Sequence, residues 1–223
     1  MNLFVIIPAY NAENTISRVI HGCLSFVPRE NIIVVDDGST DNTRSLVEQS
    51  GATIIVHDKN RGKGAALRSG FSAALKYGCD AVITLDADLQ HDPTYIAMFL
   101  DMIKKREEWG IIIGTRWRSG SKMPLDRRVS NKLTSLLISI RTGQKISDSQ
   151  SGYRFMTREL LEKVVTNEKG FMAETEILIR VSSKGFKIGT VHIPTIYESG
   201  GSHISKLTNT IEFISLYVRS FFW

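Results

Sequence analysis

The sequence predicts an α/β domain in which helices cover both faces of a mostly parallel β-sheet. Short β-branched apolar runs alternate with helical patterns through the first half of the chain, which is typical of βαβ units. Clusters of polar residues follow the apolar runs, at the carboxyl ends of strands, where sheets of this class bind ligands. With 223 residues, 42% of them hydrophobic, the chain is long enough for one domain with its own core.

Apolar periodicity defines the expected elements in the first half. Continuous β-branched runs predict buried strands over 3–7, 32–35, 53–56 and 81–85. Apolar residues at intervals of three and four predict helices over 13–25 and 64–77. Ser39 and Asp41 are expected to cap another helix between the second and third strands.

The pattern is looser in the second half. Asp92–Pro93 is expected to open a helix, and 111–113 forms a strand that leads into Gly114-Thr115-Arg116. Helices are expected over 129–141, 173–183 and 206–223. A polar loop covers 147–154, and a strand covers 188–196. The sequence shows no internal repeat or linker, so we expect a single domain over 1–223.

Two carboxylates at the end of the fourth strand indicate a metal site. Asp86 and Asp88 flank Ala87, and Gln90 adds a carbonyl oxygen nearby. Mg²⁺ and Mn²⁺ prefer oxygen ligands and keep positions open for the phosphates of a substrate. Asp-x-Asp alone is a weak motif, but its place at the end of a strand in an α/β pattern strengthens it.

Two further clusters indicate a bound nucleotide. Asp36 and Asp37 lie side by side at a strand end, where a ribose hydroxyl or a base edge would offset their repulsion, whereas Gly38 and Ser39 fit a turn with a helix cap. The segment Asn60–Gly64 precedes a helix, whose N-terminus favours anions. Together these clusters predict a diphosphate bridged by a metal and by basic groups.

The net charge of +5 is concentrated in one segment. Six basic residues and one acid, Asp126, lie between positions 116 and 132. The basic residues are Arg116, Arg118, Lys122, Arg127, Arg128 and Lys132. The run indicates either a solvated face or a site for phosphates or an anionic membrane. Nucleic acid is not expected, because aromatic residues hardly interleave with these charges.

Six segments in order resemble one enzyme family. They are Val5–Glu13, Val34–Asp41, Asn60–Gly64, Asp86–Gln90, Gly114–Arg116 and Asp148–Arg154. The chain resembles the inverting family-two glycosyltransferases with the GT-A fold, nearest to the dolichyl-phosphate mannosyltransferase and polyprenyl-phosphate sugar transferase branch. The resemblance covers about the first 155 residues and implies a hexosyltransferase that uses a nucleotide-sugar donor such as GDP-mannose or UDP-glucose.

The resemblance also implies roles for the matching positions. Those expected to hold the nucleotide sugar are Pro8, Tyr10, Asn11, Glu13, Asp36, Asp37, Lys63, Asp86 and Ala87. Asp88 and Gln90 would hold Mg²⁺ or Mn²⁺, with Asp86 nearby. Arg116 would face the donor diphosphate or an acceptor phosphate. Arg127 and Arg128 resemble a segment that receives a lipid phosphate, and Lys206 stands where the family often has a phosphate-binding lysine.

The residues themselves leave the acceptor open. A hydroxyl acceptor needs a general base, for which Glu174 is the candidate, although Glu174 and Glu176 equally fit a helix N-terminus that favours acids. A lipid phosphate needs no base, because its second pKa of about 6 leaves it largely ionised at neutral pH. The alternative to a glycosyltransferase is a protein that binds a nucleotide sugar without catalysis, or a nucleotidyltransferase.

The two halves and the tail of the chain have different expected tasks. We expect 1–115 to bind the nucleotide sugar, 116–205 to receive the acceptor, and 206–223 to form an amphipathic helix. That helix would pack on the core, lie on a membrane surface, or contact a second copy or a membrane protein. With no signal peptide and no apolar stretch of spanning length, the chain is expected in the cytoplasm, peripheral to the membrane.

Overall fold

The computed structural model describes residues 1–105, 109–116, 125–164, 166–168, 170, 172–194 and 206–223. Its strands are β1 (Leu3–Ala9), β2 (Ile32–Asp36), β3 (Thr53–Val56), β4 (Ala81–Thr84), β5 (Trp109–Arg116), β6 (Arg154–Thr157) and β7 (Lys187–Ile193). Its α-helices are α1 (Ile16–Cys23), α2 (Thr43–Ser50), α3 (Lys63–Lys76), α4 (Ile96–Lys104), α5 (Leu125–Thr142), α6 (Arg158–Lys163), α7 (Met172–Ser183) and α8 (Lys206–Arg219). Short 3₁₀ turns η1 (Arg29–Asn31), η2 (Pro93–Tyr95) and η3 (Ser220–Phe222) complete these elements.

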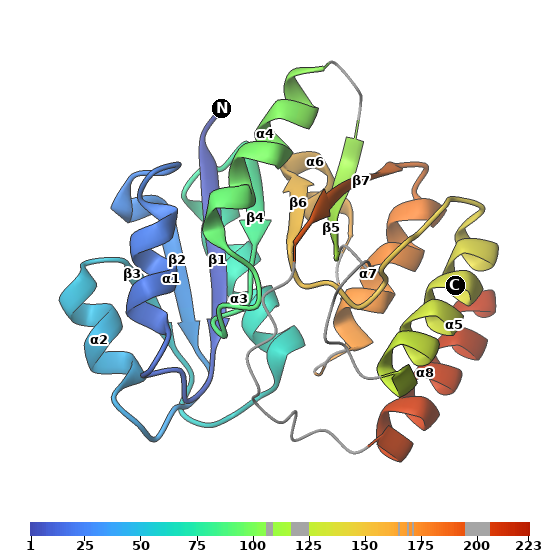
Figure 1. Ribbon diagram of the computed structural model, residues 1–223, viewed down its shortest axis with the longest axis horizontal. Helices are drawn as coiled ribbons and strands as arrows, with labels where there is room; N and C mark the ends of the chain where they lie inside the picture. The colour runs from blue at the N-terminus through green and yellow to red at the C-terminus, as the bar shows by residue number, and fades with distance from the viewer. Residues whose placement is uncertain (106–108, 117–124, 165, 169, 171, 195–205) are drawn as a thin grey trace.

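The described strands form one sheet in the order β3-β2-β1-β4-β6-β5-β7 (Figure 1). Neighbouring strands run parallel except where β6 pairs antiparallel with both β4 and β5. The sheet is therefore mostly parallel and mixed at its centre, and the predicted α/β class is confirmed. Because β1, β2 and β4 run in one direction, the loops that follow them meet at one edge of the sheet.

Two apolar layers cover the sheet. On one face, alternate residues of β1 such as Val5 and Ile7 pack with α1, α2 and α4. On the other face, the intervening residues such as Phe4 and Ile6 pack with α3, α6 and α7 and with Phe213 of α8. This period of two is the pattern of a strand buried on both sides.

Several element boundaries differ from the sequence-based expectation. Ser39 does not cap α2: its hydroxyl accepts a hydrogen bond from the Asn11 backbone, and Asp41 accepts one from the N–H of Thr43. The helix expected over 13–25 begins only at Ile16, and α5 begins four residues before the expected position 129. Helix α6 was not predicted, because six residues are too few to show a helical period.

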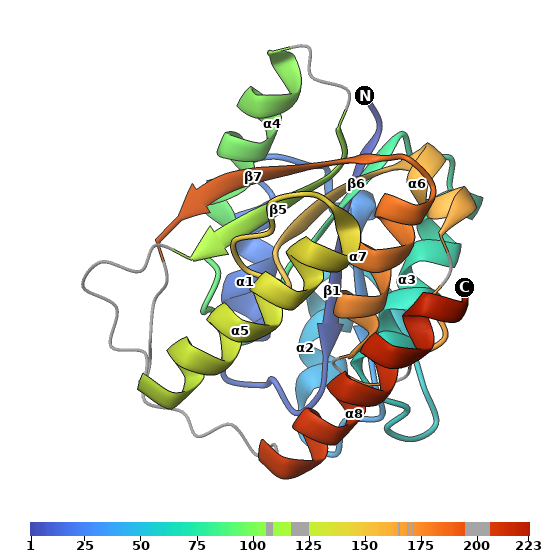
Figure 2. The ribbon, with the colours of Figure 1, turned by 90° about the vertical axis from the view of Figure 1, so that its right-hand side faces the viewer.

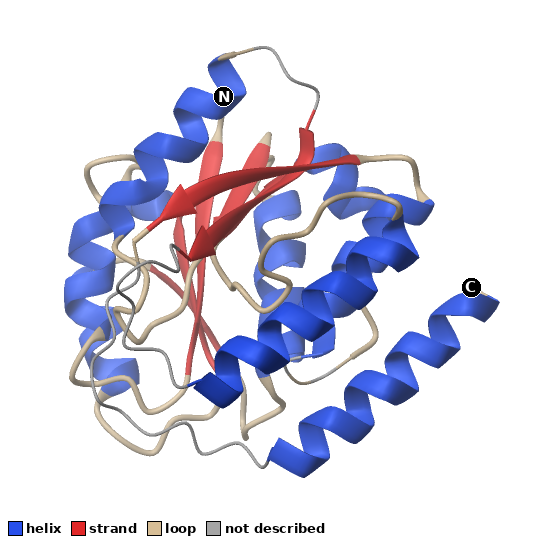
Figure 3. Ribbon diagram, turned by 45° about the vertical axis from the view of Figure 1, so that its right-hand side comes forward, coloured by secondary structure: helices blue, strands red, loops and turns tan. Residues whose placement is uncertain are grey.

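Helices α5 and α8 lie at the same end of the molecule, and both pack against α7 (Figures 2 and 3). The guanidinium of Arg141 joins them by donating a hydrogen bond to the hydroxyl of Ser220 and by lying over the Phe221 ring. Arg180 of α7 lies over the ring of Trp223, 4.2 Å from its centroid. Within the described ranges, no helix combines the length and the hydropathy that crossing a membrane demands.

Candidate active site

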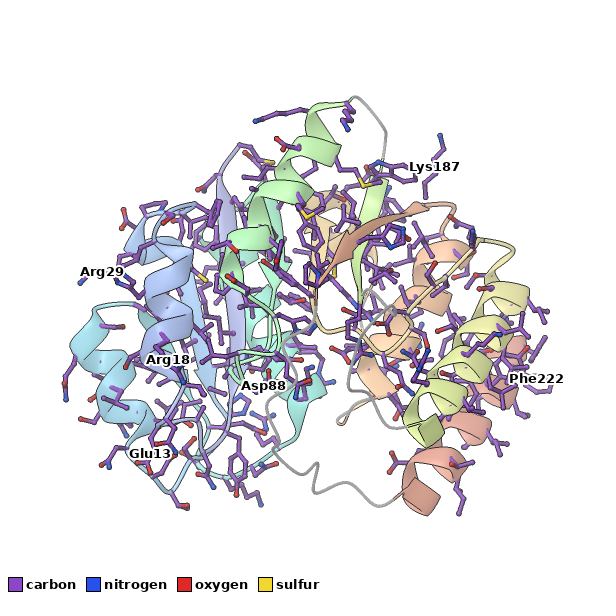
Figure 4. All side chains as sticks on the ribbon, in the orientation of Figure 1. Glu13, Arg18, Arg29, Asp88, Lys187 and Phe222 are labelled. Carbon is purple, nitrogen blue, oxygen red and sulfur yellow. The ribbon has the colours of Figure 1, made fainter. Side chains whose placement is uncertain are left out.

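The polar clusters predicted from the sequence meet at the carboxyl edge of β1, β2 and β4. Strand pairing puts Ala9 beside Asp36, and the segment that begins at Asp86 leaves the sheet directly after β4. Figure 4 shows Asp88 at this edge, between the two halves of the sheet. The edge is where a parallel sheet presents its loops to a ligand.

Lys63 joins two carboxylates from distant parts of the chain. Its ammonium lies 2.5 Å from Asp86 and 2.9 Å from Glu174 at the start of α7. Burial opposes charge on Lys63, but the charges of Asp86 and Glu174 raise its pKa above the usual value. Burial likewise opposes ionisation of Asp86, whose pKa is nevertheless lowered, chiefly by Lys63. The pair is therefore an ionised carboxylate with its counterion.

Gly152 lies against this ion pair, which occupies the space that a side chain at this position would need. A Cβ atom at this position would lie 2.7 Å from an Asp86 oxygen and 2.8 Å from the Lys63 ammonium. The loop before β6 thus closes on the acidic centre with backbone alone, which is a use of glycine that its lack of a side chain permits.

Asp88 is exposed as a residue, but the ionised form of its carboxyl group is disfavoured. Loss of hydration and then the neighbouring charge of Asp86 raise its pKa above the usual value. One of its oxygens accepts a hydrogen bond from the backbone of Gln90 at 3.0 Å. Between them, Leu89 has the left-handed backbone conformation (φ 61°), a strained state that occurs preferentially at functional sites.

The residues of this loop fit a divalent cation. Asp86 and Asp88 repel each other, and a cation between them would relieve that repulsion. Both ring nitrogens of buried His91 lack a hydrogen-bond partner among the described residues, and Nδ1 lies 3.9 Å from Asp86. Burial lowers the pKa of His91 to about 4, so the ring is neutral. Asp86, Asp88 and Gln90 offer only part of a coordination sphere, which suits a Mg²⁺ or Mn²⁺ ion that also binds substrate phosphates.

Arg116 reaches the site from the end of β5 and is held by Asp148. Its guanidinium makes two hydrogen bonds, of 2.7 and 2.9 Å, to the two oxygens of that carboxylate. Asn131 of α5 donates a third hydrogen bond to Asp148 at 2.9 Å. Burial opposes ionisation of Asp148, and the Arg116 charge nonetheless lowers its pKa. The arginine is thus fixed in orientation, and its charge contributes to the lowered pKa of Asp86.

The residues expected to hold the nucleotide surround the ends of β1 and β2. Tyr10 is exposed, and Asn11, in the left-handed region (φ 50°), accepts a hydrogen bond from the Thr40 backbone. Glu13 accepts hydrogen bonds from the backbone and side chain of Asn42. Asp36 is buried and accepts a hydrogen bond from the Ser39 backbone at 3.0 Å. Their contacts with a nucleotide, like those of Pro8 and Ala87, stay predictions.

Asp37 and Glu176 have partners within the protein. The Asp37 carboxylate, 4% exposed, accepts hydrogen bonds from the backbones of Arg61 and Gly62 and contacts His57. Glu176 accepts hydrogen bonds from the 166–168 segment and pairs with Arg180. Of the two glutamates near the start of α7, only Glu174 pairs with Lys63 in the described structure.

A groove of about 970 Å³ begins at Arg116 and runs between α5 and the edge formed by β5 and β7. Lys132 lines it with Arg116, and Leu136, Ile140 and Ile146 supply apolar walls. The end of the groove at Arg116 and Lys132, which we call its mouth, is therefore basic. A third basic residue, Lys145, lines the groove beyond the end of α5, and most of the wall is apolar. The side chains of Arg127 and Lys206, like all of Arg118 and Lys122, lie outside the described residues. Arg128 is exposed on α5.

Sequence reasoning missed the residues that hold the site together. Asp148 stood in a motif without a role of its own, and Arg154 is wholly buried, donating to the carbonyl oxygens of Ser149, Ser151 and Glu174. His91 gave no signal because a single histidine in a loop is compatible with many roles. The roles of these residues become visible only in the folded chain, where segments that are distant in the sequence come together.

Comparison with known proteins agrees with the geometry. The sequence profile of glycosyl transferase family 2 matches residues 4–165. The UDP-N-acetylglucosamine–dolichyl-phosphate N-acetylglucosaminyltransferase of Methanococcus voltae is 32% identical over 219 residues, covering 87% of this chain and 86% of the relative. The polyprenol monophosphomannose synthase of Mycolicibacterium smegmatis is 29% identical over 222 residues, covering 92% and 81%.

A solved structure shares the fold. Glucosyl-3-phosphoglycerate synthase of Mycobacterium tuberculosis, in complex with Mn²⁺, UDP and phosphoglyceric acid, superposes with a TM-score of 0.76 at 22% identity, over 99% of this chain and 77% of that one. The fold and the family match thus define a glycosyltransferase of the GT-A type. The chain belongs to glycosyl transferase family 2.

Proposed function

We propose that this glycosyltransferase moves a sugar, with inversion, from a nucleotide diphosphate sugar to a polyprenyl or dolichyl phosphate. The observation that carries the proposal is the groove at Arg116, whose basic mouth adjoins the acidic centre and whose walls are apolar. A phosphate with an attached hydrocarbon chain matches both parts. The two curated relatives described above are named for transfer to dolichyl phosphate and for synthesis of polyprenol monophosphomannose, which supports this class of acceptor.

The donor would lie across the carboxyl edge of the sheet. Its base and ribose would meet Pro8, Tyr10, Asn11, Glu13 and Asp36, in the manner the family resemblance implies. Asp86, Asp88 and Gln90 would hold Mg²⁺ or Mn²⁺, and the mycobacterial neighbour binds Mn²⁺ together with UDP. When bound, the cation would stabilise the negative charge of the leaving diphosphate. GDP-mannose and UDP-glucose represent the donor class.

The chain's own groups would place the two reactants. An acceptor phosphate oxygen attacks the anomeric carbon, the bond from that carbon to the diphosphate breaks, and a nucleoside diphosphate leaves. The transition state resembles an oxocarbenium ion. Arg116, whose orientation Asp148 fixes, would bind a phosphate at the groove mouth. Lys63 would hold Asp86 ionised and in place, and the attacking phosphate is already ionised and needs no base.

The membrane would deliver such an acceptor. Four exposed apolar side chains recur along α5, namely Val129, Leu133, Leu136 and Ile140. A second exposed stripe runs along α8 and the turn after it, namely Ile211, Ile214, Val218, Phe221 and Phe222. Figure 4 shows Phe222 pointing outward at the end of the molecule opposite Glu13 and Arg18. We propose that this end lies on the cytoplasmic face of a membrane, where the exposed Arg128 would meet anionic groups.

One set of substitutions separates a phosphate acceptor from a hydroxyl acceptor. Arg128→Ala combined with Lys132→Ala should lower transfer to a polyprenyl phosphate by about tenfold or more, because each charge-assisted contact contributes about 1.5–3 kcal/mol. Slow hydrolysis of the donor should persist. Lys76→Ala, which removes an exposed charge from α3, is the matched control.

Glu174→Gln tests the alternative, in which the acceptor is a hydroxyl and needs a general base. The glutamine keeps an oxygen for Lys63 but cannot act as a base, so transfer to a phosphate should change little. If Glu174 is essential and the two basic residues are dispensable, the acceptor is a hydroxyl. Nucleotide-sugar binding without turnover on either acceptor would favour a binding protein.

A further inference from the structure

A chain of hydrogen bonds lies behind the site and joins three segments. The Asp37 carboxylate, which follows β2, accepts hydrogen bonds from the backbone N–H groups of Arg61 at 2.9 Å and Gly62 at 2.8 Å. The same carboxylate lies 2.7 Å from Nδ1 of His57, directly after β3. The other ring nitrogen, Nε2, lies 2.9 Å from the hydroxyl of Ser69 on α3. Asp37 and His57 are both buried.

The chemistry of these groups sets the direction of the hydrogen bond between His57 and Asp37. An ionised carboxylate only accepts, so Nδ1 of His57 carries a proton and donates it to Asp37. The other ring nitrogen and the Ser69 hydroxyl form a second hydrogen bond, in which either atom can be the donor. The histidine therefore orients the carboxylate that holds the Arg61–Gly62 backbone, and Ser69 orients the histidine.

This backbone leads directly to Lys63. Gly62 precedes α3 with a backbone φ of 89°, and Lys63 is the first residue of that helix. The Asp37–Gly38 turn packs against the same loop, because a Cβ atom on Gly38 would lie 2.5 Å from the carbonyl carbon of Lys59. The position of the 59–62 loop thus decides where Lys63 enters the site and meets Asp86 and Glu174.

We propose that His57 is a positioning residue: through Asp37 it holds the backbone of Arg61 and Gly62, and so places the Lys63 ammonium between Asp86 and Glu174. Aspartate, histidine and serine follow one another as in a nucleophilic triad, but here the carboxylate also accepts from the two backbone amides that lead to Lys63. The arrangement thus connects His57 and Ser69 to the loop that precedes Lys63. The structural part of this inference stands by itself, and only its kinetic part rests on the proposed function.

Amide hydrogen exchange, followed residue by residue by NMR, tests the structural part without any substrate. His57→Asn places a donor where Nδ1 stood, whereas His57→Gln places one where Nε2 stood and leaves Asp37 without its ring partner. The amides of Arg61 and Gly62 should exchange at least about tenfold faster in His57→Gln than in the wild type, since about 1.4 kcal/mol of lost protection is tenfold. In His57→Asn they should stay within about threefold.

Equal protection of the two amides in His57→Gln and the wild type would overturn the proposal. If His57→Gln does not fold, Ser69→Ala takes its place. It removes the partner of Nε2 and should speed exchange of the Gly62 amide by about threefold, whereas an unchanged rate would again overturn the proposal.

Steady-state kinetics test the consequence for the reaction. His57→Gln should lower kcat by about tenfold while the Kd of the nucleoside diphosphate changes by less than about twofold, and His57→Asn should restore kcat. A purely structural role would lower the melting temperature and affect both variants alike, which would overturn the positioning role. If the wild type transfers no sugar, the proposed function fails, while the exchange experiment still decides the role of His57.

Discussion

The Asp86 carboxylate is charged in the folded protein because Lys63 lies beside it. Burial alone would raise the pKa of this aspartate, yet the neighbouring ammonium lowers it. Asp88, two residues further along, has its pKa raised, and it makes no ion pair with another described residue. The two acids of one motif thus differ: Asp86 is held by the protein, and Asp88 is available to a cation.

Substitution of Lys63 should reveal this pairing through its pH dependence. Lys63→Met leaves Asp86 and Glu174 without their shared counterion and should destabilise the protein at pH 7 by about 3–5 kcal/mol. The lowered pKa of Asp86 contributes stability above its unfolded value and loses it as the pH falls through the folded value. The difference from the wild type in thermal unfolding should therefore persist down to the ordinary aspartate pKa of 3.8 and shrink below it, toward pH 3. Lys63→Arg keeps the charge as a control, and an equal loss at both pH values would contradict the account.

Substitution of Asp88 should affect the cation and spare the fold. Asp88→Asn should weaken Mn²⁺ binding by about tenfold or more in calorimetry and abolish most transfer, because a ligand carboxylate is lost. Its raised pKa means that ionised Asp88 opposes folding as the pH rises through that value, so the melting temperature without metal should not fall. Asp101→Asn, an exposed acid on α4, is the control. Full transfer in EDTA would remove the metal from the mechanism.

Residue types and order along the chain singled out Asp86, Asp88 and Glu174, and in the structure Lys63 joins Asp86 to Glu174. Their roles in catalysis and metal binding stay predictions. The partners of these residues were not predictable. Lys63 was expected to face a diphosphate, and its pairing with two acids depends on α3 and α7 packing on the same face of the sheet. Arg116 was expected from its motif, but Asp148 and Asn131 meet it only in the folded chain.

Strands and helices of the first half followed from periodicity, because buried parallel strands are continuous apolar runs. The strand order of the second half could not be predicted, because β6 has only four residues. It pairs antiparallel with β4 on one side and β5 on the other. No short turn in the sequence joins β6 to either of these strands, so the sequence does not show which strands it pairs with. The early part of α5 was missed because Leu125–Arg128 carries the charges of the basic run and little apolar period.

Helix α5 offers the test of membrane contact. Val129→Asp with Leu133→Asp places two charges on the exposed stripe and should weaken binding to anionic vesicles by about tenfold or more in a sedimentation assay. The melting temperature should change little, because both side chains are exposed. Met98→Asp on α4 is a control that adds charge at another exposed apolar residue. Unchanged vesicle binding together with a concentration-dependent dimer would assign the stripe to a second copy of the chain.

At the scale of the whole molecule, the sheet order separates the residues proposed for the donor from those proposed for the acceptor. Strands β1 to β4 carry the groups expected to hold the donor, and β5, β7 and α5 form the groove proposed for the acceptor. Arg116 lines the groove and its charge influences Asp86, so the two sites meet at this arginine. The expected division near residue 115 thus coincides with the end of β5, although it remains a prediction about function.

Product analysis with a matched pair of acceptors tests the central claim most directly. The protein, with Mn²⁺, is incubated with GDP-mannose, UDP-glucose or UDP-N-acetylglucosamine and with either a polyprenyl phosphate or the corresponding polyprenol, and the lipids are analysed by mass spectrometry. The account predicts a phosphate-linked sugar lipid of inverted anomeric configuration from at least one donor, only with the phosphate acceptor, and not in EDTA. Transfer to the polyprenol as readily as to the phosphate, or undiminished transfer in EDTA, would contradict it.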